Sequence, residues 1–137
     1  MIAPLIAFLS TALAMLALDS IWLNLTADRL YRAKLGHLML QEFNLAPAAI
    51  FYFIYVTGVT VLAVMPALAD GKLSTALTRG AVLGLVAYAT YDLTNQATLR
   101  GWSTTITIID LCWGTFLTSF AASVGWWATT QIAPRLG

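Results

Sequence analysis

The fold is decided by residues 87–95, AYATYDLTN, which place the carboxyl group of Asp92 and the amide of Asn95 inside a long apolar run. That run, residues 77–99, has the length of about 20 residues that a helix needs to cross the hydrocarbon core of a membrane. A charge at such a depth is costly unless it is paired, hydrated or protonated. The stretch therefore predicts a membrane-spanning helix with one polar face that matters for function.

The composition of the whole chain agrees with this interpretation. Of the 137 residues, 60% are hydrophobic and only 9% are charged, whereas a soluble domain has roughly a quarter of its residues charged. The formal net charge is +1, and the seven basic residues are scattered rather than clustered as nucleic-acid binding requires. We therefore expect an integral membrane protein that contacts membrane lipids and has no nucleic-acid partner.

Apolar runs outside residues 77–99 predict three more transmembrane helices, at residues 2–25, 47–68 and 104–127. Asp70-Gly71-Lys72 and Arg100-Gly101 suit short turns between helices. The runs are continuous, whereas the strands of a membrane β-barrel alternate over about 10 residues. The sequence thus predicts one all-α membrane domain over residues 1–137, a compact antiparallel bundle of four transmembrane helices.

Residues 26–46, between the first two spans, alternate apolar and basic side chains at near-helical spacing. This pattern is typical of an interfacial helix lying along the lipid headgroups, and an ordinary structured loop is the alternative. Four basic residues on the side of this segment against three on the other favour a cytoplasmic first loop. We therefore expect a multi-pass protein of the bacterial inner membrane with a periplasmic N-terminus.

Two of the other spans also carry one carboxyl group each, Asp19 and Asp110. Asp92 and Asp110 are nine residues from Gly101 on either side, so both lie about 13 Å from the turn at a rise of about 1.5 Å per residue. Asp19 and the tyrosines of the second span come at a comparable depth. A shared ligand-binding pocket is therefore expected, formed by Asp19, Trp22, Tyr52, Tyr55, Tyr88, Tyr91, Asp92, Asn95, Asp110 and Trp113.

Helical periodicity indicates how these residues face. Tyr88, Tyr91, Asp92 and Asn95 follow one stripe of the third span. Trp22 and Trp113 each follow an aspartate by three residues, which hints at pseudo-symmetry between the first and fourth spans. Both indoles could equally be large core or lipid-facing side chains. Residues 80 and 84 are both glycine and would allow a neighbouring helix to approach closely.

The chemistry of the cluster is left open by the sequence. No lysine or arginine lies in the core of the spans, so at least one aspartate is protonated, a cation is held, or water reaches the cluster. Carboxyl groups could bind a cation, serve as acid and base with Asp92 and Asp110 as catalytic candidates, or fix helix packing by hydrogen bonds. The single histidine, His37, has no ligand spacing around it, so neither a metal site nor an identifiable cofactor is indicated.

Residues 51–56 (FYFIYV), 88–98 (YATYDLTNQAT) and 110–114 (DLCWG) carry a family resemblance. With these motifs the chain resembles the bacterial predicted-membrane-protein family called domain of unknown function 2177 over nearly its whole length. The resemblance implies a compact four-helix inner-membrane protein. It implies no established reaction, and so it assigns no catalytic residue.

Three functions remain open at this point. The leading hypothesis is a small inner-membrane protein whose Asp/Tyr/Asn pocket binds an amphipathic ligand or a cation, in transport or lipid metabolism. The second is an intramembrane enzyme that modifies lipid with paired aspartates as acid and base. The third is a non-catalytic accessory subunit, in a homo-oligomer or a larger membrane complex, that uses its apolar faces and its small-residue stripe.

Overall fold

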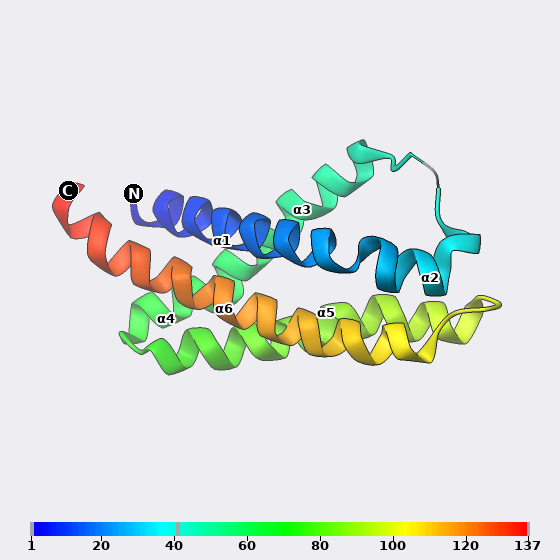
Figure 1. The fold of residues 1–137 in the computed structure, drawn as a ribbon. Helices are drawn as coiled ribbons and strands as arrows, with labels where there is room; N and C mark the ends of the chain where they lie inside the picture. Colours follow the sequence, from blue (N-terminus) through cyan, green and yellow to red (C-terminus); the bar gives the residue numbers. More distant parts are fainter. Residues whose placement is uncertain (1, 41, 137) are drawn as a thin grey trace.

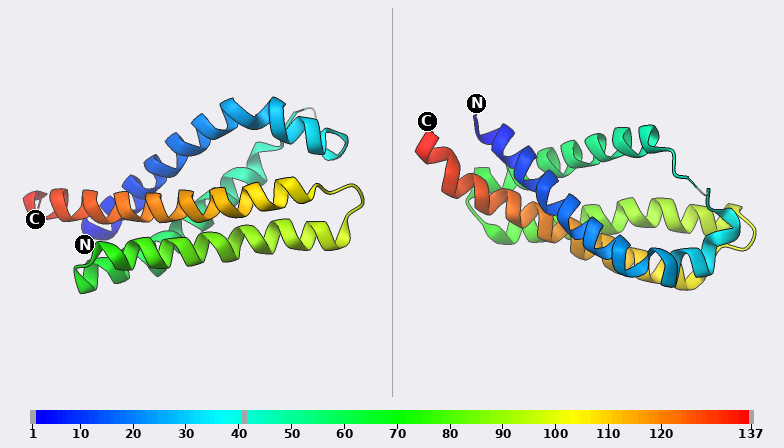
Figure 2. Two further views of the ribbon diagram at one scale, coloured as in Figure 1. Left: turned by 60° about the horizontal axis from the view of Figure 1, so that its bottom comes forward. Right: turned by 45° about the horizontal axis from the view of Figure 1, so that its top comes forward.

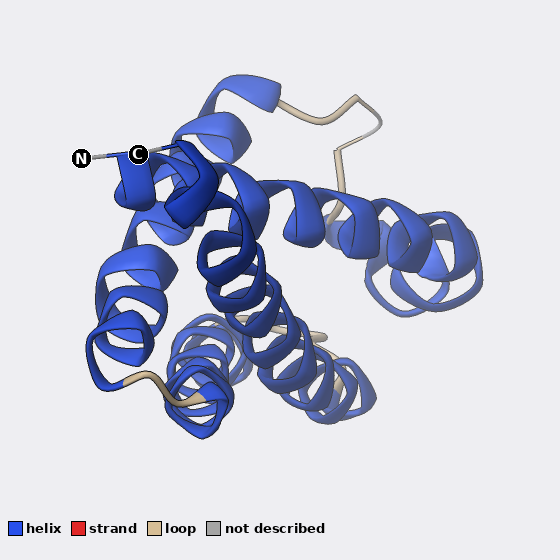
Figure 3. Cartoon of the chain, turned by 90° about the vertical axis from the view of Figure 1, so that its left-hand side faces the viewer, coloured by secondary structure: helices blue, strands red, loops and turns tan. Residues whose placement is uncertain are grey.

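The computed structural model describes residues 2–40 and 42–136, and throughout this part of the chain it consists of helices and connecting loops (Figure 3). Four long helical rods pack together, with both chain ends at one end of the bundle and the α5–α6 turn at the other (Figure 1). The predicted all-α fold is therefore confirmed.

The first rod is longer than a single transmembrane helix. α1 (Ile2–Thr26) runs into a π-helical turn (Ala27–Tyr31), α2 (Arg32–Leu35) and a 3₁₀ turn (Gly36–Leu38) without an intervening loop. The segment predicted as an interfacial helix is thus helical as far as Leu38, where it continues the first rod, and a loop then leads to Leu45. No glycine or proline interrupts it before Gly36, and buried Leu35 packs it against the bundle. Whether it lies at the headgroups stays a prediction.

The second rod consists of α3 (Leu45–Val59), a π-helical turn (Thr60–Val64) and α4 (Met65–Asp70). Pro66 in its last part has no N–H to donate to the preceding turn, which leaves a carbonyl without its usual partner. Arg79 Nη1 donates to the carbonyl of Leu62 in that turn at 3.4 Å. The irregular helix is therefore supported by a hydrogen bond from α5.

α5 (Leu73–Thr98) and α6 (Thr104–Leu136) form a tightly packed helical hairpin. A Cβ atom added at Gly80 would lie 2.8 Å from the backbone Cα of Ser119, and one at Gly84 would collide with the Gly114 carbonyl group. The predicted close approach at the two glycines is confirmed, and the partner is α6 of the same chain. These two glycines are therefore occupied by a contact within the chain, and the accessory hypothesis stays a prediction that rests on the apolar faces.

Three of the four rods are both long and apolar enough to cross a membrane: Ile2–Leu38, Leu45–Asp70 and Thr104–Leu136. α5 has 26 residues and is about 39 Å long at about 1.5 Å per residue, which is sufficient in length. Its polar residues, Asp92 and Asn95 among them, make it less apolar than the other three. α6 extends well beyond the predicted end at residue 127.

The apolar core lies in the half of the bundle near the chain ends, where small side chains allow close packing. Ala7, Ala63, Ala67, Ala121 and Ala122 are fully buried there. α3 joins this core through its C-terminal half, whereas residues 45–51 are all exposed. The N-terminal end of α3 lies apart from α5 and α6 (Figures 1 and 2). The buried carboxyl groups of Asp92 and Asp110 lie in this more open half.

Candidate intramembrane binding site

Two tryptophans from antiparallel helices form the centre of the polar half. The rings of Trp22 on α1 and Trp113 on α6 stack with their centroids 4.4 Å apart and their planes at 9°. Each indole follows an aspartate by three residues in its own helix. Trp113 Nε1 donates to Asp19 of the other helix, whereas Trp22 Nε1 donates to the hydroxyl of Tyr31. The hydrogen bonds of the two D-x-x-W segments are therefore not equivalent.

Asp19 on α1 accepts hydrogen bonds from two other helices. Trp113 Nε1 donates to Asp19 Oδ1 at 3.3 Å, and the Tyr52 hydroxyl of α3 donates to Oδ2 at 3.0 Å. Both carboxyl oxygens thus have a donor, from two different helices. A typical hydrogen bond contributes about 0.5–1.5 kcal/mol, and these two link α1 to α3 and α6 through Asp19.

Asp110 on α6 accepts a hydrogen bond from Tyr31, which lies in the π-helical turn that follows α1. The hydroxyl of Tyr31 donates a short hydrogen bond to Asp110 Oδ1. The same hydroxyl accepts a hydrogen bond from Trp22 Nε1 at 3.1 Å. Trp22 is therefore linked to Asp110 through the Tyr31 hydroxyl, whereas Trp113 donates a hydrogen bond to Asp19 directly.

Asp92 on α5 differs from both. Its side chain is fully buried, and neither carboxyl oxygen has a hydrogen-bond partner within the described part of the chain. The neighbouring ionisable group is the carboxyl of Asp110, which is close enough to interact with it directly. The equal depth predicted for Asp92 and Asp110 thus corresponds to a real juxtaposition.

No basic side chain neutralises these carboxyl groups. Over residues 2–40 and 42–136, the single ion pair joins Arg32 Nε to Asp28 Oδ1 at 3.0 Å, on the surface. The described residues also contain no group of three His, Cys, Asp or Glu side chains placed to hold a metal ion. Protonation, a bound cation or water is therefore needed to stabilise these carboxyl groups.

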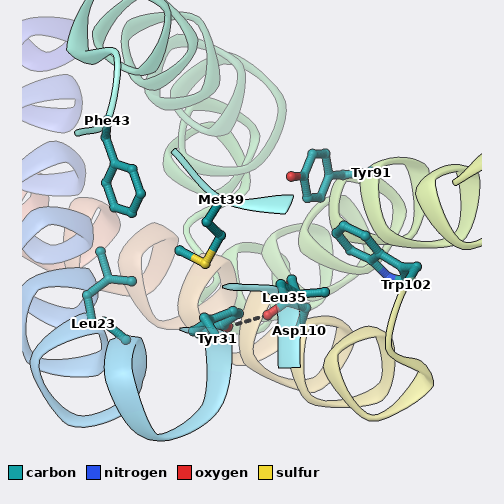
Figure 4. Close-up of a pocket in the computed structure, with 9 residues that line it drawn as sticks. Leu23, Tyr31, Leu35, Met39, Phe43, Tyr91, Trp102 and Asp110 are labelled. Carbon is teal, nitrogen blue, oxygen red and sulfur yellow. Dashed lines mark hydrogen bonds between the residues drawn. The ribbon is translucent and has the colours of Figure 1, made fainter. Parts of the chain in front are cut away.

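A cavity of about 230 Å³ opens beside Asp110 (Figure 4). Leu23 and Phe43 lie on one side of it, Tyr91 and Trp102 lie on the other, and the Tyr31–Asp110 hydrogen bond lies at its base. The remaining lining residues are Ala27, Leu35 and Met39. Asp110 is the only residue in the lining that is normally charged at neutral pH. The described lining of the cavity is therefore apolar and aromatic, with one acidic side chain, Asp110.

A second, larger cavity of about 380 Å³ lies between α3 and α5, where α3 separates from the bundle. Its lining residues are Phe51, Ala87, Tyr88 and Tyr91. Tyr91 lines both cavities and forms an edge-to-face contact with Trp102, the ring centroids being 5.9 Å apart. Its ring therefore lies between the cavity beside Asp110, which we call the acidic cavity, and the cavity between α3 and α5, which we call the apolar groove.

The other expected pocket residues have different surroundings. The Tyr55 hydroxyl shares a 2.7 Å hydrogen bond with Thr118 Oγ1 and so joins α3 to α6. The Tyr88 ring packs against Gly114, where any Cβ atom would collide with it. Asn95 is half-buried. The stripe predicted on α5 is therefore divided between the interior, where Asp92 lies, and the groove, where Tyr91 is 61% exposed.

Two polar residues of the site were not among those predicted. Tyr31 belonged to the expected interfacial segment, and Trp102 lies between the third and fourth predicted spans. Trp102 lines the acidic cavity, and its Nε1 donates to Thr107 Oγ1 at 3.0 Å. The amphipathic pattern of residues 26–46 was the available signal, because its apolar face needed a surface to cover.

The chain matches the family described as predicted membrane protein (DUF2177) over residues 4–127, and it belongs to that family. This agrees with the resemblance carried by the tyrosine and aspartate motifs. No curated protein and no solved structure matches the chain.

Proposed function

We propose that this membrane protein binds, in the cavity beside Asp110, an amphipathic molecule with a cationic head group. The observation that carries the proposal is the lining of that cavity, in which Asp110 is the one charged residue among apolar and aromatic side chains. We place the protein in the bacterial inner membrane, with the first loop cytoplasmic and the N-terminus periplasmic.

The chemistry of the lining selects among head groups. A phosphate group is normally bound by arginine or lysine, and the cavity contains neither. A cation is attracted both by a carboxylate and by the faces of Tyr and Trp rings, which Tyr31, Tyr91 and Trp102 provide. An alkyl tail fits the apolar groove, whose volume of about 380 Å³ lies within the range of about 300–1,000 Å³ typical of ligand pockets.

The test is an equilibrium titration of the purified protein in maltoside micelles with octyltrimethylammonium, followed by tryptophan fluorescence. Asp110→Asn should weaken binding at least about tenfold, a loss of about 1.4 kcal/mol. Asp28→Asn is the matched control, because Asp28 is 88% exposed and pairs only with Arg32. Equal binding of octyltrimethylammonium and octanol, or no effect of Asp110→Asn, would contradict the proposal.

Catalysis on lipid at the same site is the second candidate, favoured by the direct proximity of the Asp92 and Asp110 carboxyl groups. Two carboxyl groups in different environments are a common acid–base pair. Incubation with total bacterial lipid, followed by mass spectrometry, distinguishes the two functions. If a new lipid species forms and its formation requires both Asp92 and Asp110, catalysis on lipid is the function, in place of ligand binding alone.

A further inference from the structure

The unpartnered carboxyl of Asp92 is the feature that the proposed function does not use. It is completely buried, and within residues 2–40 and 42–136 neither of its oxygens receives a hydrogen bond. An ionised carboxylate in this position would lose its hydration without compensation, which costs many kcal/mol. A protonated carboxyl has an O–H group to donate, and the Asp110 carboxyl beside it is an acceptor.

The directions of the surrounding hydrogen bonds indicate which of the two carboxyls holds a proton. Trp22 Nε1 donates to the Tyr31 hydroxyl, and that hydroxyl donates to Asp110. Asp110 is thus the acceptor at the end of a chain of donors, as suits an ionised carboxylate. Asp92 has no donor, so the proton belongs on Asp92, from which it completes a second bond to Asp110.

The titratable groups around Asp92 are few. Asp110 faces it from α6, Tyr31 approaches from the π-helical turn, and Tyr91 is its neighbour on α5. Asp19, which is half-buried, already accepts hydrogen bonds from Tyr52 and Trp113. In the part of the chain that the structure describes, no ion pair links any of these carboxyls to a basic side chain.

We propose that Asp92 carries an exchangeable proton and that a cationic head group entering the cavity beside Asp110 displaces it to water. The O–H bond of Asp92 breaks, its electron pair stays on the carboxylate, and the ligand keeps its own charge. The two carboxyls carry one negative charge before the exchange, and the two carboxylates together with the ligand carry one negative charge after it. The exchange therefore adds no net charge to the membrane interior, where charge is costly.

This inference rests on the proposed function, since it takes the ligand to be a cation. It goes beyond that function because it couples binding of the ligand to release of a proton from Asp92. A quaternary ammonium ion is the decisive probe because it has no proton to lose. Any proton released when octyltrimethylammonium binds must come from the protein.

The experiment is calorimetry of octyltrimethylammonium binding in maltoside micelles, in two buffers of different ionisation enthalpy at the same pH. Wild type should release about one proton per bound cation, and its affinity should rise about tenfold per pH unit by linkage. Asp92→Asn should bind the cation without proton release and without this pH dependence. Asp28→Asn, with its exposed carboxyl, should behave as wild type.

Infrared spectroscopy of the ligand-free protein supplies a measurement that does not depend on binding. A protonated-carboxyl band should be present in wild type and Asp28→Asn and be lost in Asp92→Asn. Cation binding that depends on Asp110 but releases no proton would overturn the coupling and leave the proposed function intact. Absence of cation binding would overturn both. If Asp92→Asn does not fold, the proton count of wild type alone decides.

Discussion

Gly84→Ala is a direct test of the hairpin on which the site is built. A Cβ atom at this position would lie 2.8 Å from Thr118 Oγ1 and 2.9 Å from the Gly114 carbonyl carbon, and nearer still to the carbonyl oxygen. Two of these atoms are backbone, so α5 and α6 must move apart. Overpacking of this kind costs about 1–3 kcal/mol, whereas alanine itself favours a helix over glycine by about 0.5–1 kcal/mol.

The chain offers a control that isolates the packing cost. Gly58 is also inside a helix, and a Cβ atom there would meet nothing within 4 Å. Gly58→Ala therefore gains helix preference without overpacking, and Gly84→Ala should be less stable than it by about 1–3 kcal/mol. Unfolding in maltoside micelles, followed by circular dichroism, measures the difference. Equal stability of the two alanine variants would refute the close contact between α5 and α6.

The same unfolding assay tests the hydrogen bonds of two side chains, Tyr31 and Trp126. Tyr31→Phe leaves the half-buried indole N–H of Trp22 and a carboxyl oxygen of Asp110 without their shared partner and should cost about 1–3 kcal/mol. Tyr91→Phe, at a 61% exposed ring, should change stability by less than about 0.5 kcal/mol. Trp126→Phe removes the 3.1 Å bond from Nε1 to the Ala67 carbonyl and should cost about 0.5–1.5 kcal/mol. Trp127→Phe, at a 60% exposed ring, is its control, and equal losses in either pair would contradict the assigned bond.

The helical rods and the depth of the carboxyls were accessible from the sequence because both depend on local quantities. Hydropathy over about 20 residues identifies a span, and a fixed rise per residue converts sequence distance into depth. Asp92 and Asp110 meet because a short turn at Gly101 lies midway between them. In an antiparallel hairpin, equal distance from the turn is enough to predict a neighbour.

The role of Tyr31 depended on information that local patterns do not contain. An amphipathic segment covers whatever apolar surface it meets, either lipid or the bundle. The hydroxyl of Tyr31 reaches a residue 79 positions away, and nothing in residues 26–46 specifies that partner. The same reasoning applies to Trp102, since an aromatic ring at the end of a span suits both a membrane anchor and the wall of a cavity.

The structure also separates two interpretations that the sequence could not. A packing network and a functional pocket were alternatives for all three intramembrane aspartates together. Asp19 fits the packing interpretation, because Tyr52 and Trp113 occupy both of its oxygens. Asp110 lines a cavity, and Asp92 beside it has no hydrogen-bond donor among the described residues. A carboxyl whose two oxygens both accept hydrogen bonds holds helices together, whereas one that lacks a donor still needs a proton or a ligand. The pocket interpretation therefore stays a proposal, and the observations that support it concern Asp92 and Asp110.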